Sequence, residues 1–109
     1  MIYEHRTYVI PPGRMGEILA RFRDHTMRLF QRHGIEVVGF WVTDIGPRSY
    51  GELVYLCRFS DLNARQEAWE RFRNDPEWIE VKQRTEANGP IVERVEVKIL
   101  VPTDFSPMQ

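Results

Sequence analysis

The chain has little cysteine, no excess of charge of either sign and no long hydrophobic run. Its 109 residues include one cysteine, Cys57, so an internal disulfide is excluded, and we expect a reducing compartment, the cytoplasm. With 15 basic and 16 acidic side chains, no overall field attracts the protein to nucleic acid or to an anionic membrane. No apolar stretch approaches membrane-spanning length, and no leader pattern precedes the first predicted strand, so we expect neither a membrane-spanning nor a secreted protein.

Sequence motifs that indicate a particular chemistry are also lacking. There is no glycine-rich phosphate loop, no legible pairing of a nucleophile with a base, and no set of metal ligands at recognisable spacing. His25 and His33 have no partner at metal-ligand spacing, and we interpret both as structural histidines. The sequence therefore predicts no cofactor and no metal.

What the chain does contain is a regular order of strand and helix patterns. Runs of bulky and β-branched residues predict strands over residues 2–10, 35–44, 52–59 and 91–101. Apolar residues at helical spacing predict a first helix over residues 14–33. A second helix is expected to begin at an N-cap of Ser60 or Asp61 and to break at residues 74–76, where Asp75 caps a further short helix.

The order strand–helix–strand–strand–helix–strand predicts an α+β fold of the ferredoxin-like type. Two right-handed crossovers joined by a hairpin give a four-stranded antiparallel sheet, with the first and third strands central and both helices on one face. We assign residues 1–109 to this single domain, with residues 102–109 as a C-terminal tail. Within the second strand, Gly39 indicates a bulge or the close approach of a bulky neighbour.

Alternation along the strands divides their side chains between the two faces of the sheet. Val95, Val97 and Ile99 suit the face covered by helices. The polar and aromatic side chains expected on the opposite, open face are Glu4, Arg6, Tyr8, Arg94, Glu96 and Lys98. An open face that also carries apolar surface is expected to pack against the same face of a second chain, so we predict a homodimer. A shift in register of one residue would exchange the two faces.

Several segments also carry a resemblance to a known family. The chain resembles the NIPSNAP family in five segments in the right order, at residues 3–8 with 12–13, 38–41 with 45–46, 56–60, 75–78 and 99–107. The resemblance implies a ferredoxin-like domain of the dimeric α/β-barrel superfamily, in which pockets lie between sheet and helices. That superfamily includes cofactor-independent monooxygenases, haem-degrading enzymes and isomerases, but a fold alone transfers none of these activities. His5 stands where the family usually has an apolar residue, and Tyr55 and Cys57 stand where it has histidine and tryptophan.

Glu4 and Arg6 form the first candidate site, because residues two apart on a strand point the same way. As chemistry, Arg6 would bind a carboxylate and Glu4 would act as a base. As structure, the two would join Arg94 and Glu96 in a cluster of ion pairs at a dimer interface, and we prefer this second interpretation.

His5 is the candidate catalytic residue. It is expected on the helix-covered face together with Tyr3, Trp41 and Tyr55. In order of preference, it is a hydrogen-bonded core residue, a base that abstracts a proton from an activated aromatic substrate, or a haem ligand.

Four arginines form a stripe along the first helix: Arg14, Arg21, Arg28 and Arg32. Because Glu17 and Asp24 lie beside them and weaken their field, we interpret the stripe as a solvated face and not as a phosphate-binding surface.

Two functions follow, and the sequence leaves open whether the protein is an enzyme. The first is a small homodimeric protein that binds a small molecule or a partner without chemistry. The second is a cofactor-independent monooxygenase or isomerase that uses His5. The candidate binding residues are Glu4, Arg6, Tyr8, Trp41, Tyr55 and Arg94.

Overall fold

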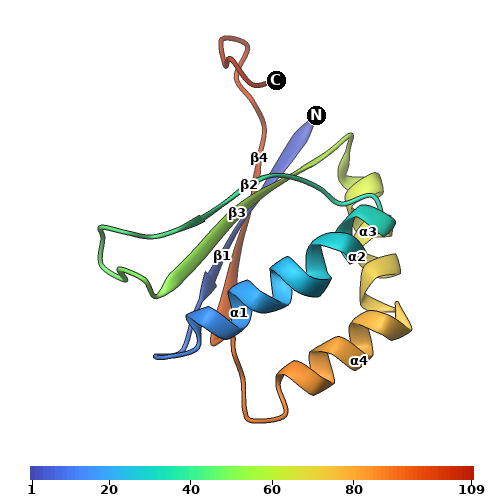
Figure 1. The fold of residues 1–109 in the computed structure, drawn as a ribbon. Coiled ribbons are helices and arrows are strands. Elements are labelled where there is room, and N and C mark those ends of the chain that lie inside the picture. The colour runs from blue at the N-terminus through green and yellow to red at the C-terminus, as the bar shows by residue number, and fades with distance from the viewer.

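A four-stranded antiparallel sheet forms the frame of the computed structural model, which describes all 109 residues (Figure 1). Its strands are β1 (Ile2–Val9), β2 (Glu36–Val42), β3 (Glu52–Phe59) and β4 (Arg94–Leu100). Their order is β2-β3-β1-β4, so β1 and β3 are central. The predicted ferredoxin-like α+β fold is confirmed. β3 has the predicted bounds, and the other strands are shorter than predicted.

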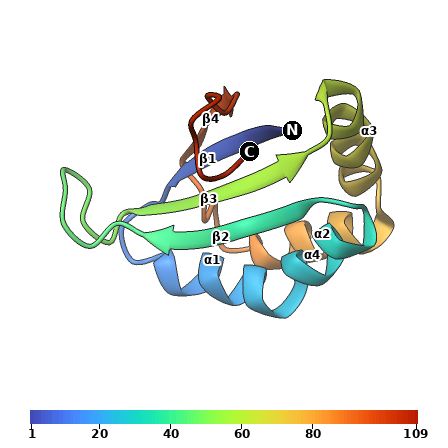
Figure 2. The same cartoon turned by 90° about the horizontal axis from the view of Figure 1, so that it is seen from above.

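The helices cover one face of this sheet (Figure 2). The first helical segment runs through α1 (Met15–Arg21), the π-helical turn η1 (Phe22–Thr26) and α2 (Met27–Arg32). After β3 come α3 (Leu62–Arg73) and α4 (Pro76–Thr85). The opposite face of the sheet carries no helix (Figure 2).

Two aspartates start the later helices, as the sequence predicted. The Asp61 side chain accepts a hydrogen bond from Ala64 N at 2.8 Å and caps α3. Asp75 accepts one from Glu77 N at 2.9 Å and caps α4, with Pro76 at the first helical position. Asp75 also joins α4 to α2, because its Oδ2 lies 2.7 Å from His33 Nε2 and 2.9 Å from Arg32 Nη1.

Replacement of Asp75 should therefore cost more stability than the loss of an ordinary cap. We expect Asp75→Ala to lower the free energy of unfolding by about 2 kcal/mol, near the upper end for caps. The hydrogen bond from His33 is the main cause that lowers the pKa of Asp75 to about 2, from 3.8. The stabilisation that comes from the ionised Asp75 carboxylate is present above pH 3.8 and is lost as the pH falls towards 2.

Chemical denaturation of the wild type and the variant across this pH range measures the effect. Asp61→Ala is the matched control, because Asp61 caps a helix but has no second helix to hold. Equal losses in the two variants would contradict the role given to the contacts with α2.

The second strand contains both features that Gly39 predicted. The pairing with β3 shifts by one residue between Val37 and Gly39, which marks a β-bulge. A Cβ atom at Gly39 would lie 2.8 Å from Cη2 of Trp41, so the indole ring covers this position. Both the bulge and the close approach are therefore confirmed.

The interpretation of the arginine stripe is wrong for one of its members, Arg21. Only 6% of Arg21 is exposed, because the C-terminal end of α4 packs across α1. There Arg21 Nη1 donates to Glu86 Oε2 at 3.0 Å and to Thr85 Oγ1 at 3.3 Å. The spacing of residues along one helix does not show where a second helix will pack against it. For this reason the sequence pattern predicts a solvent-exposed Arg21.

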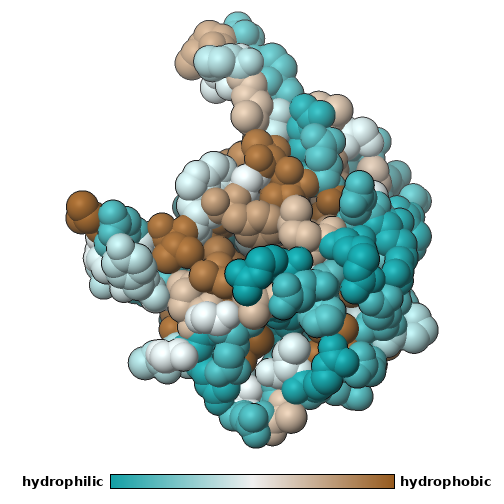
Figure 3. Space-filling view, viewed as in Figure 1, coloured by the Kyte–Doolittle hydropathy of each residue, from teal (hydrophilic) through white to brown (hydrophobic).

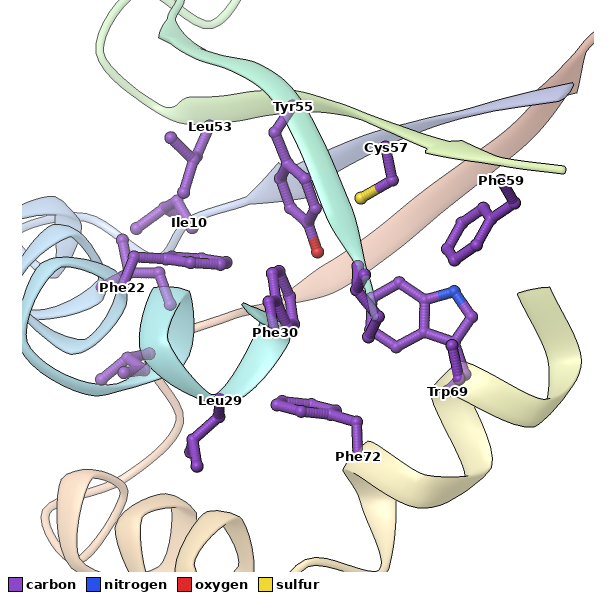
Figure 4. Close-up of a cluster of buried hydrophobic side chains, with 14 residues drawn as sticks. Ile10, Phe22, Leu29, Phe30, Leu53, Tyr55, Cys57, Phe59, Trp69 and Phe72 are labelled. Carbon is purple, nitrogen blue, oxygen red and sulfur yellow. The ribbon is translucent and has the colours of Figure 1, made fainter. Parts of the chain in front are cut away.

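Aromatic rings from the sheet and the helices supply six of the 14 residues of the core cluster (Figure 4). Tyr55 and Cys57 of β3 point towards Phe30, while Trp69 and Phe72 face them from α3 (Figure 4). The rings of Phe30 and Trp69 meet edge to face, with centroids 5.4 Å apart. Burial raises the pKa of the Cys57 thiol to about 12, so it stays protonated and packs as a small apolar group.

Candidate functional site

The first strand directs the side chains of Glu4, Arg6 and Tyr8 towards the helices. Trp69 Nε1 of α3 donates to Glu4 Oε1 at 2.9 Å, and the Tyr8 ring packs at a tilt against Phe22 of η1, with centroids 5.8 Å apart. The assignment of Glu4, Arg6 and Tyr8 to the open face is therefore wrong. The prediction assumes that charged side chains avoid the helix-covered face. Here, however, the charge is paired, which allows its burial.

Glu4 is the centre of a buried hydrogen-bond network. Its carboxylate is completely inaccessible to solvent, and it accepts hydrogen bonds from Arg65 Nε at 2.6 Å and from Arg6 Nη1 at 2.6 Å. Burial opposes ionisation, but the hydrogen bonds from Arg65, Trp69 and Arg6 outweigh it and hold the pKa of Glu4 below its ordinary value of 4.5. Glu4 is thus a structural carboxylate that orients two arginines.

Arg6 stays charged although it is largely buried. Its guanidinium lies over the Trp69 ring, 4.5 Å from the centroid, and 5.8 Å from the Tyr55 centroid. Burial acts to lower the pKa of Arg6, but Tyr55, Tyr8 and Glu4 outweigh it and raise the value. Its Nε is buried without a hydrogen-bond partner, so part of its donor capacity is not used by the protein.

Two tyrosine hydroxyls meet beside Arg6. The Tyr8 and Tyr55 oxygens are 2.9 Å apart and share a hydrogen bond. Burial, followed by the neighbouring Tyr8, raises the pKa of Tyr55 well above 10.0. Tyr55 therefore takes part in this hydrogen bond as a neutral hydroxyl.

A pocket of about 360 Å³ opens between these strand residues and three helices. The sheet contributes residues of β1 and β4, and the opposite walls come from α1, α3 and α4. Its aromatic lining consists of Tyr8, Trp69, Phe72 and Trp78. Its cationic lining consists of Arg6, Arg21, Arg65, Arg73 and Lys82. This volume falls within the usual range for small-molecule sites.

The pocket brings together only part of the predicted site. Glu4, Arg6, Tyr8 and Tyr55 form one cluster beside it. The expected link from Glu4 and Arg6 to Arg94 and Glu96 is absent, because those two pair with each other on the opposite face, at 3.0 Å.

The candidate catalytic residue His5 does not reach the pocket. It pairs in register with Leu56 on β3 and with Lys98 on β4, and so it lies on the open face. Trp41 lies on the same face, opposite Val54. The predicted placement of His5 and Trp41 beside Tyr55 is therefore wrong, since neighbours on one strand alternate between faces.

Most of the helical residues of the pocket were missed from the sequence. Arg65 and Trp69 are four residues apart on α3, and this spacing brings both to Glu4. That spacing was a usable signal, because a carboxylate on a central strand needs donors at helical spacing. Arg21 and Trp78 come from different helices, and their contact, 5.0 Å from guanidinium to ring centroid, has no sequence signal.

No helix of the structure combines the length and the hydrophobicity needed to cross a membrane. No three His, Cys, Asp or Glu side chains lie close enough together to hold a metal ion.

The sheet order, the helices on one face and the pocket between them define a ferredoxin-like α+β domain. The NIPSNAP family model matches residues 3–107, so this chain belongs to the NIPSNAP family. The orangutan (Pongo abelii) Protein NipSnap homolog 3A is 29% identical over 80 residues, which cover 73% of this chain. The match spans only 31% of that longer protein.

Solved structures of relatives that match over nearly their whole chains agree with the fold. A NIPSNAP family protein of unknown function from Agrobacterium tumefaciens is 32% identical, with a TM-score of 0.86 over 100% of this chain and 94% of that one. A second from the same organism is 30% identical, with a TM-score of 0.87 over 99% and 98% of the two chains. SnoaB, a cofactor-independent oxygenase from Streptomyces nogalater, has a TM-score of 0.57 at 12% identity, over 97% and 96% of the chains. At this identity the likeness shows the fold alone.

Proposed function

We propose that this chain is a homodimeric small-molecule-binding protein whose ligand occupies the pocket between the sheet and the helices. The observation that carries the proposal is the pocket of about 360 Å³ in which aromatic rings and cations converge from β1, α1, α3 and α4. A concave site with an apolar lining and a few oriented polar groups is typical of small-molecule binding. We do not propose the enzymatic alternative, because it needs His5 in the pocket and His5 lies on the other face.

Val95 offers a direct test, because it lines the pocket from β4 and is 40% exposed. We expect Val95→Trp to fill the pocket without disturbing the core. Some small organic molecules should raise the melting temperature of the wild type, and the same molecules should leave the melting temperature of Val95→Trp unchanged. The measurement is a thermal-shift screen of wild type and variant against the same compounds.

Val97→Trp is the matched control. Val97 is two residues further along the same face of β4, is 43% exposed and does not line the pocket. It should respond to each compound as the wild type does. If no compound stabilises the wild type, or if Val95→Trp responds equally, the proposal fails.

The proposed dimer uses the open face of the sheet. In Figure 3, hydrophobic surface gathers over the sheet, between the β2–β3 loop and the C-terminal tail, and hydrophilic residues cover most of the helical side. On the open face Trp41 is 55% exposed and lies opposite Val54, which in turn pairs with Thr7. Charges of both signs border this apolar centre on β4, where Glu96 pairs with Thr7 and Lys98 pairs with His5. Such a surface can be self-complementary across a two-fold axis, and we therefore assign a second copy of the chain to it.

A further inference from the structure

The two most restrained cations of the pocket are Arg6 and Arg21, which come from opposite layers of the fold. Arg6 belongs to β1 and lies over Trp69, while Arg21 belongs to α1 and lies over Trp78. Each is also fixed by one carboxylate, at 2.6 Å from Glu4 and 3.0 Å from Glu86. Stacking and ion pairing together orient both guanidinium groups before any ligand arrives, which reduces the entropic cost of binding.

These arginines keep donors that the protein does not use. Arg6 donates a hydrogen bond from Nη1 only, and Arg21 likewise donates from Nη1 only. The Nε atoms of both are buried without partners, and 94% of the Arg21 surface is removed from solvent. The Nη2 group of each arginine also makes no hydrogen bond within the protein and is not among the buried unpartnered atoms, so it keeps some access to solvent and is free to donate to an acceptor in the pocket.

The charge of the lining favours an anion as that acceptor. Five of the 13 lining residues carry cationic side chains, and Glu86 is the only lining residue with a carboxylate. Glu4 lies behind the lining and is occupied by Arg6 and Arg65. Arg73 and Lys82 lie at the mouth and take part in none of the salt bridges of the chain. A cleft with this excess of positive charge concentrates anions.

The remaining lining indicates what the anionic group is attached to. Tyr8, Phe72, Val92 and Val95 contribute apolar surface beside the two stacked tryptophans. A volume of about 360 Å³ is near the lower end for small-molecule sites, which suits a body of one or two rings. Two planar guanidinium groups match the two oxygens of a planar carboxylate.

We infer that the ligand is a small aromatic carboxylate, with its carboxylate bound by Arg6 and Arg21 and its ring among the aromatic and valine side chains of the pocket. This inference rests on the proposed function and adds the chemical class of the ligand. Tyr8, whose hydroxyl shares a hydrogen bond with that of Tyr55, lines the same pocket and offers a further polar group.

The test is isothermal titration with a panel of probe pairs. Benzoate, trans-cinnamate and 2-naphthoate are each compared with the neutral carboxamide of the same ring system, and phenyl phosphate is added as a second anion. We expect at least one carboxylate to bind at least about tenfold more tightly than its carboxamide, the size expected for charge-assisted hydrogen bonds. Equal affinities within every pair, or no binding by any carboxylate, would overturn the inference. Tighter binding of phenyl phosphate than of every carboxylate would also overturn it.

Variants locate the anion. Arg21→Met should weaken carboxylate binding at least about tenfold and leave carboxamide binding within about twofold. Arg28→Met is the matched control, because Arg28 pairs with Glu77 on the surface outside the pocket, and it should change neither. Because Arg21 is buried, Lys82→Met at the exposed mouth is a second variant that should fold, and it should weaken the carboxylate alone. Losses that are equal for carboxylate and carboxamide would contradict the inference.

Val95→Trp distinguishes failure of the proposed ligand site from failure of the proposed ligand class. If Val95→Trp abolishes the binding of both members of a pair that bind equally well, the pocket is right and the anionic ligand is wrong. If Val95→Trp binds both members as the wild type does, the ligand site itself is elsewhere and the proposed function fails.

Discussion

The variant Glu4→Gln is expected to lower the free energy of unfolding by about 3 kcal/mol, the lower end of the range for removing one partner of a buried ion pair. The loss arises because Arg6 and Arg65 keep their charges after their shared carboxylate is gone. Arg65 is 29% exposed and can turn towards water, but the side chain of Arg6 is only 16% exposed and stays in place. Urea denaturation of the wild type and the variant at pH 7 measures the difference.

The same variant should change the pH dependence of stability. Because the pKa of Glu4 is lowered in the folded chain, this carboxylate stabilises the fold above pH 4.5, its ordinary value. This contribution to the free energy of unfolding is lost as the pH falls below that value. Because Glu4→Gln has no carboxylate to protonate there, its stability should fall less than that of the wild type over the same pH range. Glu17→Gln is the control, because Glu17 pairs with Arg14 on the surface, at 2.8 Å. Its effect should stay below about 1 kcal/mol, as for exposed pairs, and equal effects at both sites would contradict the buried network.

The second large effect is expected at the open face. Val54→Glu should convert the proposed dimer into a monomer, because a carboxylate at this position would be buried without a partner in the interface. A cost of about 3 kcal/mol or more corresponds to a rise of at least about a hundredfold in the dissociation constant. Sedimentation equilibrium of both proteins at micromolar concentration measures this change.

Leu62→Glu is the matched control for the dimer. Leu62 is a 58% exposed apolar residue at the start of α3, outside the sheet, and its replacement should leave the dimer intact. A wild type that sediments as a single chain, or a dimer that survives Val54→Glu, would contradict the face-to-face arrangement.

Local features of the fold were predictable because they depend on neighbouring residues. The caps at Asp61 and Asp75 and the bulge at Gly39 each follow from chemistry within a few positions, and the structure contains all three. The strand order also followed, because few topologies connect two crossovers through a hairpin.

Local chemistry does not predict which side chains of β1 point towards the helices. Alternation separates Glu4, Arg6 and Tyr8 from Tyr3, His5 and Thr7, but it does not say which set faces the helices. That choice depends on Arg65 and Trp69, which lie more than sixty positions away from Glu4 and supply its hydrogen bonds. A carboxylate in a sequence predicts an exposed side chain. Its burial is favourable only when hydrogen-bond donors such as Arg65 and Trp69 are placed beside it.

The candidate site was predictable in part for the same reason. Arg6 and Tyr8 stood out as polar and aromatic residues on a central strand. Arg21 did not, because its position along the first helix gave it the same solvated appearance as Arg28 and Arg32. Its burial depends on where α4 crosses α1, through Glu86 and Thr85.

The most direct test of the ligand site uses the three tryptophans of the chain. Trp69 and Trp78 line the pocket, whereas Trp41 lies on the open face of the sheet. A nitrogen–proton correlation spectrum shows the three indole N–H signals, which single Trp→Phe variants assign. On titration with the tightest-binding aromatic carboxylate, the signals of Trp69 and Trp78 should shift and that of Trp41 should stay unchanged. A shift confined to the Trp41 signal would place the ligand on the open face and contradict the account.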